Sequence, residues 1–295
     1  MEWEKFTLES RELFNRYYKN YQGISDMTFT NLYIWSFGRE IVYCEEDGFL
    51  FVKVKYSEGE PFFFLPVGEG EFKGAVEKLI KEESGNMKIV FKSATEEKAE
   101  TLKNLFPDKF EYIEERDRFD YLYSVKELIE LSGKKFHKKK NQVNNFMKNY
   151  EWEYVRYSGK DIIELLKLQQ LWCDINRCSE DLWLSNEEAG IIKAVENFEN
   201  LNFKAGALKV DGEIVAFSFG EQVSPDTVVI HIEKGDSRFD GVYQMMNNIF
   251  LKEEFSDMIY VNREEDLGIE GLRQAKMSYN PLKLIKKIRV EMKQR

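Results

Sequence analysis

The chain has 295 residues, of which 43% are apolar, 15% aromatic and 33% charged, with a formal net charge of −10 at neutral pH. This composition excludes an intrinsically disordered chain, and no run reaches the roughly 18 consecutive apolar residues of a membrane-spanning helix. The opening MEWEKFTLES lacks the basic and then apolar pattern of a secretory signal. We therefore expect a folded cytoplasmic protein of one large domain or two of about 150 residues.

The first half predicts two helices, a three-stranded meander, and then alternating helices and strands. The meander covers residues 40–67, with turns at Asp47-Gly48 and Glu58-Gly59, which favour antiparallel hairpins. The other predicted elements are helices at 8–21, 25–37, 72–83 and 96–105, and strands at 87–92, 110–115 and 121–125.

The second half repeats this order of elements. Three strands fill residues 203–235, with turns at Asp211-Gly212 and at 224–226. Around them we predict strands at 152–157, 258–262 and 284–292, and helices at 161–174, 186–199, 241–254 and 269–277. The repetition predicts two domains, 1–125 and 151–295, joined by a rigid basic helix at 126–150.

The three cysteines do not suggest a disulfide framework or a zinc site. Cys44, Cys173 and Cys178 are odd in number and lack C-x-x-C spacing. We expect buried free thiols, because free cysteine packs as a small hydrophobe. We also expect no metal and no tightly bound cofactor.

The repeated order resembles the topology of the GNAT acyltransferase fold, present in tandem. Two motifs strengthen a resemblance to the C-terminal domain of phosphatidylglycerol lysyltransferases, in particular to soluble bacterial relatives of that domain, and more distantly to Fem-type aminoacyl transferases. The motifs are Lys138-Lys139-Lys140-Asn141 with Phe146, and Asn262, Asp266-Leu267-Gly268, Gly271-Leu272-Arg273, Lys276, Tyr279 and Pro281. The resemblance implies tandem GNAT-like α/β domains (of the α+β type) with mixed, mostly antiparallel sheets, of which the second is catalytic and the first is not.

The resemblance also implies a reaction class. An acyl or aminoacyl group would move to an amine or hydroxyl without a metal, from aminoacyl-tRNA or, alternatively, from acyl-CoA. The acceptor would be a small molecule or a lipid headgroup, the latter at the membrane surface, although the chain shows no membrane-embedded region like that of the lysyltransferases. The alternative is a degenerate, non-enzymatic module that binds a small anion or nucleic acid.

The segment after the strand at 258–262 is the first candidate site. Glycines at 268 and 271 permit a tight turn and close helix packing, and Asp266 is placed to cap the next helix. Arg273 and Lys276 share a helix face and suit a carboxylate, a phosphate or an oxyanion. By resemblance, Lys276 lies at the reactive carbonyl, and substrate contacts fall on Asn262, Glu265, Asp266, Arg273 and Tyr279. The alternative is a helix-capping network with a surface ion pair.

The strand ending at residue 235 and the loop after it form the second candidate. His231 and Glu233 share one strand face, where either could accept a proton, or they are a core histidine and a rim carboxylate. By resemblance the loop cradles the donor, with Tyr243 replacing a small residue and obstructing a diphosphate; the alternative is a plain turn capped by Asp240. The donor residues are Arg238, Gly241, Tyr243 and Gln244. The first-half equivalent, with glycines at 68, 70 and 74, we interpret as vestigial.

The basic helix is the third candidate. Residues 131–150 contain six lysines and no acid, and another basic cluster follows Leu282. Like charges four residues apart destabilise a helix, which favours an anionic partner such as tRNA. The predicted contacts are Lys138, Lys139, Lys140 and Asn141; the alternative is a solvated helix in which His137 also lies at the surface.

Overall fold

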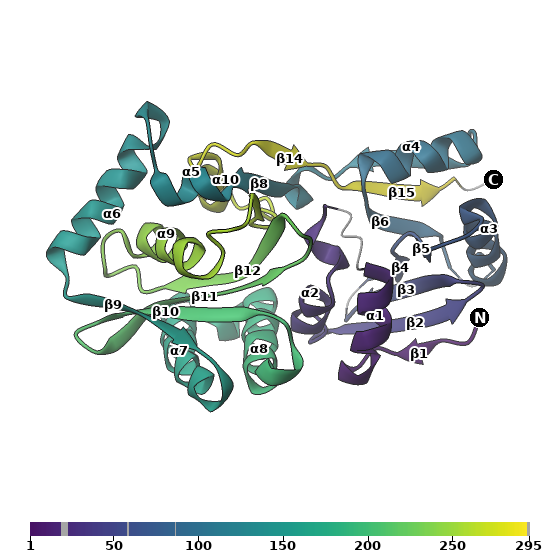
Figure 1. The fold of residues 1–295 in the computed structure, drawn as a ribbon. Coiled ribbons are helices and arrows are strands. Elements are labelled where there is room, and N and C mark those ends of the chain that lie inside the picture. Colours follow the sequence, from purple (N-terminus) through teal and green to yellow (C-terminus); the bar gives the residue numbers. More distant parts are fainter. Residues whose placement is uncertain (19–22, 58, 86, 294–295) are drawn as a thin grey trace. The chain divides into compact units, whose positions relative to one another are not determined.

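The computed structural model describes residues 1–18, 23–57, 59–85 and 87–293. The chain forms two compact units, each with its own mixed sheet (Figure 1). The N-terminal unit comprises Met1–Asp120, Glu265–Gly268 and Ile285–Arg295, and the C-terminal unit comprises Tyr121–Glu264 and Ile269–Leu284. The end of the first predicted helix and Glu58 of the second predicted turn lie outside the described residues.

The N-terminal unit is built on a sheet of order β1-β2-β3-β4-β6-β15-β7, with β5 paired to β3. Asp47 and Gly48 both have positive φ, as a two-residue turn between β2 and β3 requires. Thr28 and Thr95 cap helices α2 and α4. The strands are β1 (Glu4–Lys5), β2 (Arg39–Glu46), β3 (Phe49–Tyr56), β4 (Phe62–Phe63), β5 (Val67–Gly68), β6 (Val90–Ala94), β7 (Phe110–Glu114) and β15 (Ile288–Met292), and the helices are α1 (Arg11–Tyr18), α2 (Phe29–Ile34), α3 (Phe72–Glu83) and α4 (Glu96–Leu105).

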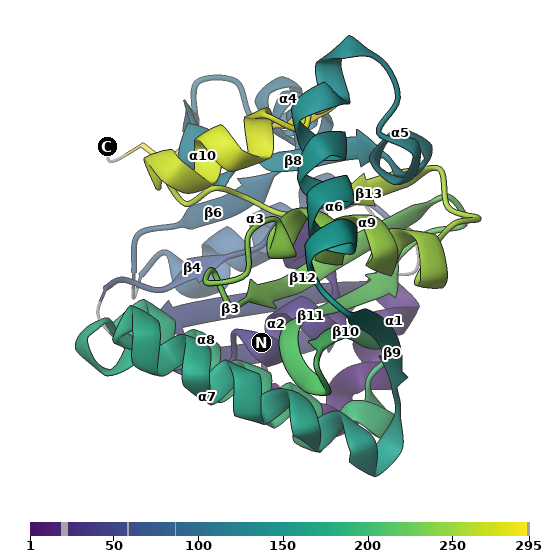
Figure 2. The same ribbon diagram turned by 90° about the vertical axis from the view of Figure 1, so that its left-hand side faces the viewer.

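The C-terminal unit has a sheet of order β14-β8-β13-β12-β11-β10-β9. Helices α7 and α8 cover one face of this sheet, and α6 and α9 lie on the other (Figure 1). Turned by 90°, the structure shows α6 alongside α9 (Figure 2). The strands are β8 (Asp120–Ser124), β9 (Trp152–Tyr157), β10 (Lys204–Val210), β11 (Glu213–Gln222), β12 (Thr227–Gly235), β13 (Tyr260–Asn262) and β14 (Lys283–Ile285), and the helices are α5 (Val125–Glu130), α6 (His137–Asn149), α7 (Leu165–Asn176), α8 (Leu182–Glu196), α9 (Val242–Glu254) and α10 (Glu270–Met277).

The two central strands of the C-terminal sheet part from each other. Parallel pairing joins Thr227–Val229 of β12 to Tyr260–Asn262 of β13. Beyond that point β12 continues to Gly235, whereas β13 ends. This splay, together with the meander β10-β11-β12, confirms the predicted tandem GNAT-like fold with mixed sheets.

The closing strands are exchanged between the units, which corrects the predicted linear division at 125 and 151. The strand predicted at 284–292 is divided: β14 lies in the C-terminal sheet, whereas β15 pairs with β6 and β7 in the N-terminal sheet. β8, expected to close the first half, pairs with β13 in the C-terminal sheet. A periodicity that identifies a strand does not identify its neighbour, because alternation reports only which face is buried.

The exchange predicts that residues 1–125 do not fold alone. Without β15, the edges of β6 and β7 lose their partner, and the core loses Val290, which is fully buried. We expect this fragment to show no cooperative thermal transition. A fragment of residues 1–120 joined by a flexible linker to residues 285–293 should regain one. A sharp transition in the first fragment would contradict the exchange.

The basic segment is two helices rather than one rigid connector. α5 ends where Leu131 adopts a left-handed conformation with φ 46°, and Gly133 follows with φ 81°. α6 begins four residues after that glycine, at His137. Both helices belong to the C-terminal unit. The lysine pattern alone carried no signal for this break, because lysine is compatible with every turn of a helix.

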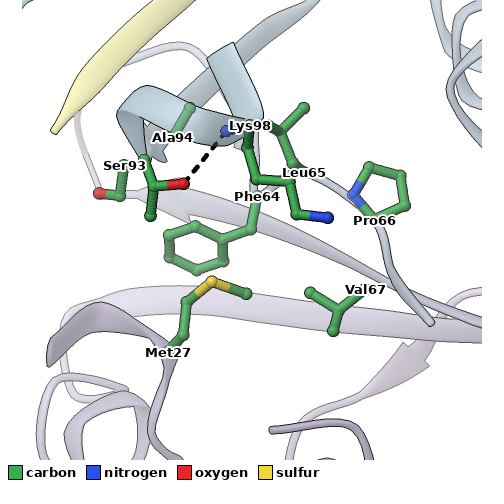
Figure 3. A pocket seen from close by; sticks show the side chains of 9 residues that line it. Met27, Phe64, Leu65, Pro66, Val67, Ser93, Ala94 and Lys98 are labelled. Atoms are coloured by element: carbon green, nitrogen blue, oxygen red, sulfur yellow. Dashed lines mark hydrogen bonds between the residues drawn. The ribbon is translucent and has the colours of Figure 1, made fainter. Parts of the chain in front are cut away.

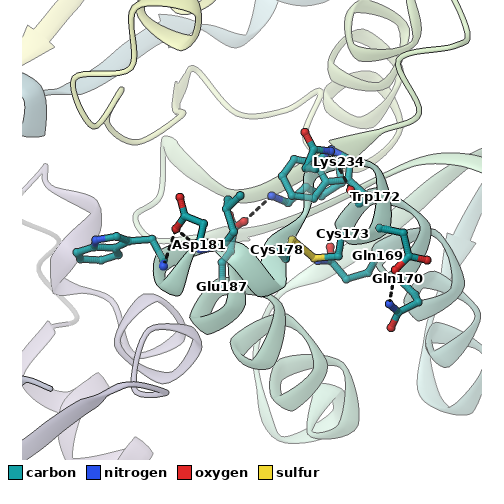
Figure 4. The surroundings of a disulfide bond; sticks show 12 residues. Gln169, Gln170, Trp172, Cys173, Cys178, Asp181, Glu187 and Lys234 are labelled. Atoms are coloured by element: carbon teal, nitrogen blue, oxygen red, sulfur yellow. Dashed lines mark hydrogen bonds and ion pairs between the residues drawn. A yellow bond between two sulfur atoms is a disulfide. The ribbon is translucent and has the colours of Figure 1, made fainter.

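Two of the cysteines form a disulfide, contrary to the expectation of free thiols. Cys173 near the end of α7 is bonded to Cys178 in the turn before α8 (Figure 4). Cys44 is free and buried. Arg177 between them has a left-handed φ of 54°, which reverses the chain. The five-residue separation is outside the spacings used to recognise a redox or zinc motif, so the fold was needed to reveal the pair.

No helix within the described part of the chain is both long and apolar enough to cross a membrane.

Candidate functional site

The part of β12 beyond its pairing with β13 presents two different chemistries on its two faces. Glu233 points to the side of α9, where Asn247 Nδ2 donates to it at 3.2 Å. Lys234 points to the opposite side, where it forms an ion pair with Glu187 of α8 and lies 3.6 Å from the centre of the Trp172 ring (Figure 4). The register with β11 shifts at His231, because Phe219 pairs with Ile232 and Gly220 with Ile230. This bulge interrupts the alternation between His231 and Glu233, which corrects the prediction that they share one face of the strand.

His231 is buried between two carboxylates. Its Nδ1 lies 2.8 Å from Glu264 and its Nε2 lies 2.9 Å from Glu221. Burial alone would lower the pKa of His231, but the hydrogen bonds and charges of the two glutamates outweigh it and raise the pKa to about 9. The imidazole is therefore protonated at neutral pH and has no nitrogen left to accept a proton.

This arrangement predicts a stability that declines in alkaline solution. A histidine whose pKa is about 9 when folded and 6.5 when unfolded stabilises the fold fully below pH 6.5, and the contribution is lost as pH rises through 9. We expect the free energy of unfolding to fall by roughly 2–4 kcal/mol between those limits. Denaturant titrations of His231→Gln should lack this slope, whereas the surface variant His137→Gln should keep it.

Glu233 forms an ion pair with Arg263, the first residue after β13. Arg263 Nη2 donates to Glu233 Oε1 at 2.9 Å, and both side chains are nearly buried. Burial works against the charge of Arg263, but Glu233 and Tyr279 raise its pKa, so the guanidinium stays charged. Arg263 was not among the predicted residues, although it follows Asn262 of the motif directly, because the direction of its side chain depends on where β13 ends.

Lys276 reaches the same segment from α10. Its Nζ donates to the backbone carbonyls of Arg263 and of Glu264, the latter at 3.2 Å. Tyr123 of β8 donates its hydroxyl to the carbonyl of Lys276 at 2.9 Å. The three predicted catalytic residues are thus brought together around residues 263 and 264, with the Lys276 ammonium held on backbone oxygens.

Lys139 joins this cluster from the first turn of α6. It is 8% exposed, and its Nζ lies 4.2 Å from the centre of the Tyr279 ring. Burial, Arg263 and Lys138 together lower the pKa of Lys139 to about 8. The predicted surface cluster of tRNA-binding residues is therefore divided: Lys138, Lys140 and Asn141 are exposed, whereas Lys139 packs into the C-terminal unit.

The loop between β12 and α9 differs from the predicted donor cradle in its details. Arg238 folds back onto Asp236 in a bidentate ion pair. The cap of α9 is Gly241, not Asp240, and a Cβ at Gly241 would lie 2.7 Å from the carbonyl oxygen of Gln142. Close approach of α6, together with a φ of 80°, accounts for the glycine.

Tyr243 anchors the start of α9 to the end of β12. Its hydroxyl donates to the carbonyl of Gly235 at 2.9 Å and accepts from Trp172 Nε1 at 3.2 Å. The ring is therefore held against the strand end where a donor diphosphate was considered. Gln244, one residue on, hydrogen-bonds Tyr279 and joins the cluster around Lys139.

The remaining residues of the motif have structural partners. Asn262 is fully buried and accepts from the amide of Glu264 at 2.8 Å. Asp266 does not cap α10; its Oδ1 accepts from Gly268 N, and its Oδ2 pairs with Arg116 at 3.0 Å. Open space surrounds Gly271, so close packing does not explain it. Arg273 is half-buried on α10.

Glu265 belongs to a buried charge cluster of the N-terminal unit. Lys287 has no exposed side-chain surface, and its Nζ contacts Asp120 at 2.8 Å, Glu265 at 3.2 Å and also Asp26. Arg118 pairs with Asp26 at 3.0 Å and with Glu265 at 3.2 Å. These three carboxylates lie close enough for a metal site, and Lys287 supplies a cation to them.

In the N-terminal unit, the parallel strands β4 and β6 correspond to β12 and β13, and the space at their ends is nearly filled. At the ends of β4 and β6, Met27, Phe64, Leu65, Ser93 and Ala94 line a cavity of about 10 Å³, which is room for one water molecule (Figure 3). The side chain of Glu71 accepts from Gly74 N at 2.7 Å and occupies the start of α3. A carboxylate of the chain thus occupies the amide groups that an anion could use at this helix start, and the non-catalytic role of this unit stays a prediction.

Several solved structures share the fold of this chain. A crystal structure of a conserved protein of unknown function from Bacteroides thetaiotaomicron is 34% identical, with 99% of this chain and 100% of that chain covered and a TM-score of 0.93. L-PGS from Bacillus licheniformis is 13% identical (99% and 94% covered, TM-score 0.69), and FemX is 10% identical (98% and 97% covered, TM-score 0.61). At these identities the last two show the fold alone.

Sequence comparison agrees with the structural one. An uncharacterised protein of Mycoplasmoides gallisepticum is 28% identical over 176 residues, a match that spans 59% of this chain and 56% of that protein's length. The family model described as phosphatidylglycerol lysyltransferase, C-terminal, matches residues 19–291, almost the whole chain. With its tandem GNAT-like fold and this match, the chain belongs to the phosphatidylglycerol lysyltransferase C-terminal domain family.

Proposed function

We propose that this protein transfers an aminoacyl group from aminoacyl-tRNA to an amine or hydroxyl acceptor. The amine or hydroxyl attacks the ester carbonyl, a new C–N or C–O bond forms, and the bond to the ribose oxygen of the tRNA breaks. The acceptor loses a proton and the ribose oxygen gains one. The observation that carries the proposal is the splay of β12 from β13, together with the cluster of Glu233, Arg263 and Lys139, in a chain of this family.

Each residue has a role that follows from its surroundings. We assign the proton-accepting role to Glu233, because His231 is already protonated between Glu221 and Glu264. His231 then positions Glu264, and Lys276 holds the backbone on either side of it. Arg263, next to Glu233, suits the negative charge that develops on the carbonyl oxygen.

Aminoacyl-tRNA is favoured over acyl-CoA by the loop after β12. Arg238 is engaged by Asp236, and Tyr243 packs against Gly235, where a diphosphate would need close access to the backbone. The exposed lysines of α6, Lys138 and Lys140, suit the phosphates of a tRNA. The acceptor we leave as an amine or hydroxyl, of a small molecule or a lipid headgroup.

The experiment is a screen for transfer from radiolabelled aminoacyl-tRNAs, with acetyl-CoA as the competing donor. We expect transfer from at least one aminoacyl-tRNA and no measurable coenzyme A binding by calorimetry. Tight coenzyme A binding with acetyl transfer would reverse the choice of donor. If neither donor reacts while tRNA binds with a steep salt dependence, the protein is a binding module instead.

A further inference from the structure

Lys139 is a buried cation without a matching anion. Among the described residues its Nζ has no hydrogen bond or ion pair, and its contact is with the face of the Tyr279 ring at 4.2 Å. Buried lysines are uncommon unless paired, because removing an ammonium from water is costly. Its position therefore calls for an explanation other than packing.

Arg263 approaches the same ring and also has an unused donor. Its Cζ lies 4.8 Å from the centre of the Tyr279 ring, and its Nη1 is a buried atom with no hydrogen-bond partner in the described part of the chain. Its other terminal nitrogen is used by Glu233. Lys139 of α6 and Arg263 at the end of β13 therefore both contact the Tyr279 ring, and each has a hydrogen-bond donor without a partner among the described residues.

We propose that Lys139 and Arg263 form a receptor beside Tyr279 for a monoanionic oxygen group, either a carboxylate or a phosphodiester. An oxygen anion would receive charge-assisted hydrogen bonds from Lys139 Nζ and Arg263 Nη1, neither of which has a hydrogen-bond partner among the described residues. Glu233 neutralises one of the two positive charges, so the cluster retains a single net charge and matches a monoanion better than a dianion.

The groups that face Lys139 from all sides support this role. Arg263 after β13 and Lys138 on α6 repel its charge, Glu233 on β12 attracts it, and burial lowers its pKa to about 8. Tyr279, which carries the ring, is neutral because burial raises its pKa. The negative charge of a bound anion would favour the ammonium form of Lys139 and raise its pKa. Binding of the anion is therefore coupled to proton uptake by Lys139 and weakens as pH rises above 8.

The receptor deepens the proposed function by giving the transfer site a subsite for an acidic group of the donor or acceptor. Anion binding to the receptor is measured without the transfer reaction. The experiment can therefore refute the receptor without refuting the proposed transferase activity, and the reverse is also true. The probes are acetate for a carboxylate, dimethyl phosphate for a phosphodiester, and sulfate as the dianion, each titrated at constant ionic strength.

The first measurement follows the lysine side-chain resonances of the unmodified protein by NMR, with Lys139→Arg used to assign the signal. We expect the Lys139 amine to titrate well below the other lysines, and its pKa to rise when acetate or dimethyl phosphate is added. A response to acetate alone identifies a carboxylate, and a response to dimethyl phosphate alone identifies a phosphodiester.

The second measurement compares variants on the same helix. Lys139→Met should weaken binding of the effective probe roughly 10- to 100-fold, the usual loss of one charge-assisted hydrogen bond. Lys148→Met, an exposed lysine of α6, should leave it unchanged. The receptor is refuted if Lys139 titrates with the surface lysines and no probe shifts it, if sulfate binds more tightly than both monoanions, or if the two methionine variants behave alike.

Discussion

Replacing Lys287 with methionine is expected to lower the free energy of unfolding by about 3–5 kcal/mol, the usual cost of leaving buried charges without their partner. Lys287 is fully buried among Asp26, Asp120 and Glu265. Burial opposes its charge, but these carboxylates raise its pKa well above the ordinary value, so it is an ammonium at every physiological pH. Methionine fills the space and removes the charge.

Denaturant unfolding measures this effect, and the neighbouring residue provides the control. Lys286 is half-exposed and pairs with Glu96 and Glu114 at the surface, so Lys286→Met should change the free energy of unfolding by less than about 1 kcal/mol. Adding Asp120→Asn to Lys287→Met should restore part of the loss by removing one unpaired carboxylate. Equal effects of the two lysine variants would show that the cluster does not stabilise the unit.

Glu233→Gln is expected to lower the rate of aminoacyl transfer by about 10²–10⁴, the range for loss of a general base. Glutamine keeps the shape of the side chain and a hydrogen-bond acceptor for Asn247, but it cannot take a proton and it leaves Arg263 without its anion. Binding of the donor should change less than the rate, because the substitution removes a charge at the reacting centre. Single-turnover kinetics separate the two effects.

The control for this variant is Glu253→Gln, on the exposed side of the same helix that carries Asn247. It should transfer at the unmodified rate. If Glu233→Gln retains full activity, the proton acceptor lies elsewhere. Lys139, whose pKa of about 8 places it near neutrality, is then the group to examine.

Local chemistry explains most of what was predicted correctly about the fold. The turns Asp47-Gly48 and Asp211-Gly212 require positive φ at both residues, which aspartate and glycine tolerate, so the two meanders were predictable. These features depend on a few adjacent residues and not on the rest of the molecule.

Three features of the fold were not predicted from the pattern of apolar residues. The exchange of β8 and β15, the disulfide between Cys173 and Cys178, and the break after α5 each depend on packing that periodicity does not report. The protonation states and contacts of the charged side chains were the least predictable properties.

The sequence by itself determined the order of elements, the hairpins and the motif in which the site lies, because these follow from backbone preferences and side-chain alternation. Only the tertiary structure decided that His231 is protonated between two glutamates, that Lys276 binds backbone carbonyls, and that Lys139 leaves the basic surface to meet Arg263 at Tyr279. The physical reason is that the protonation and reach of a charged side chain depend on burial and on charges contributed by other elements.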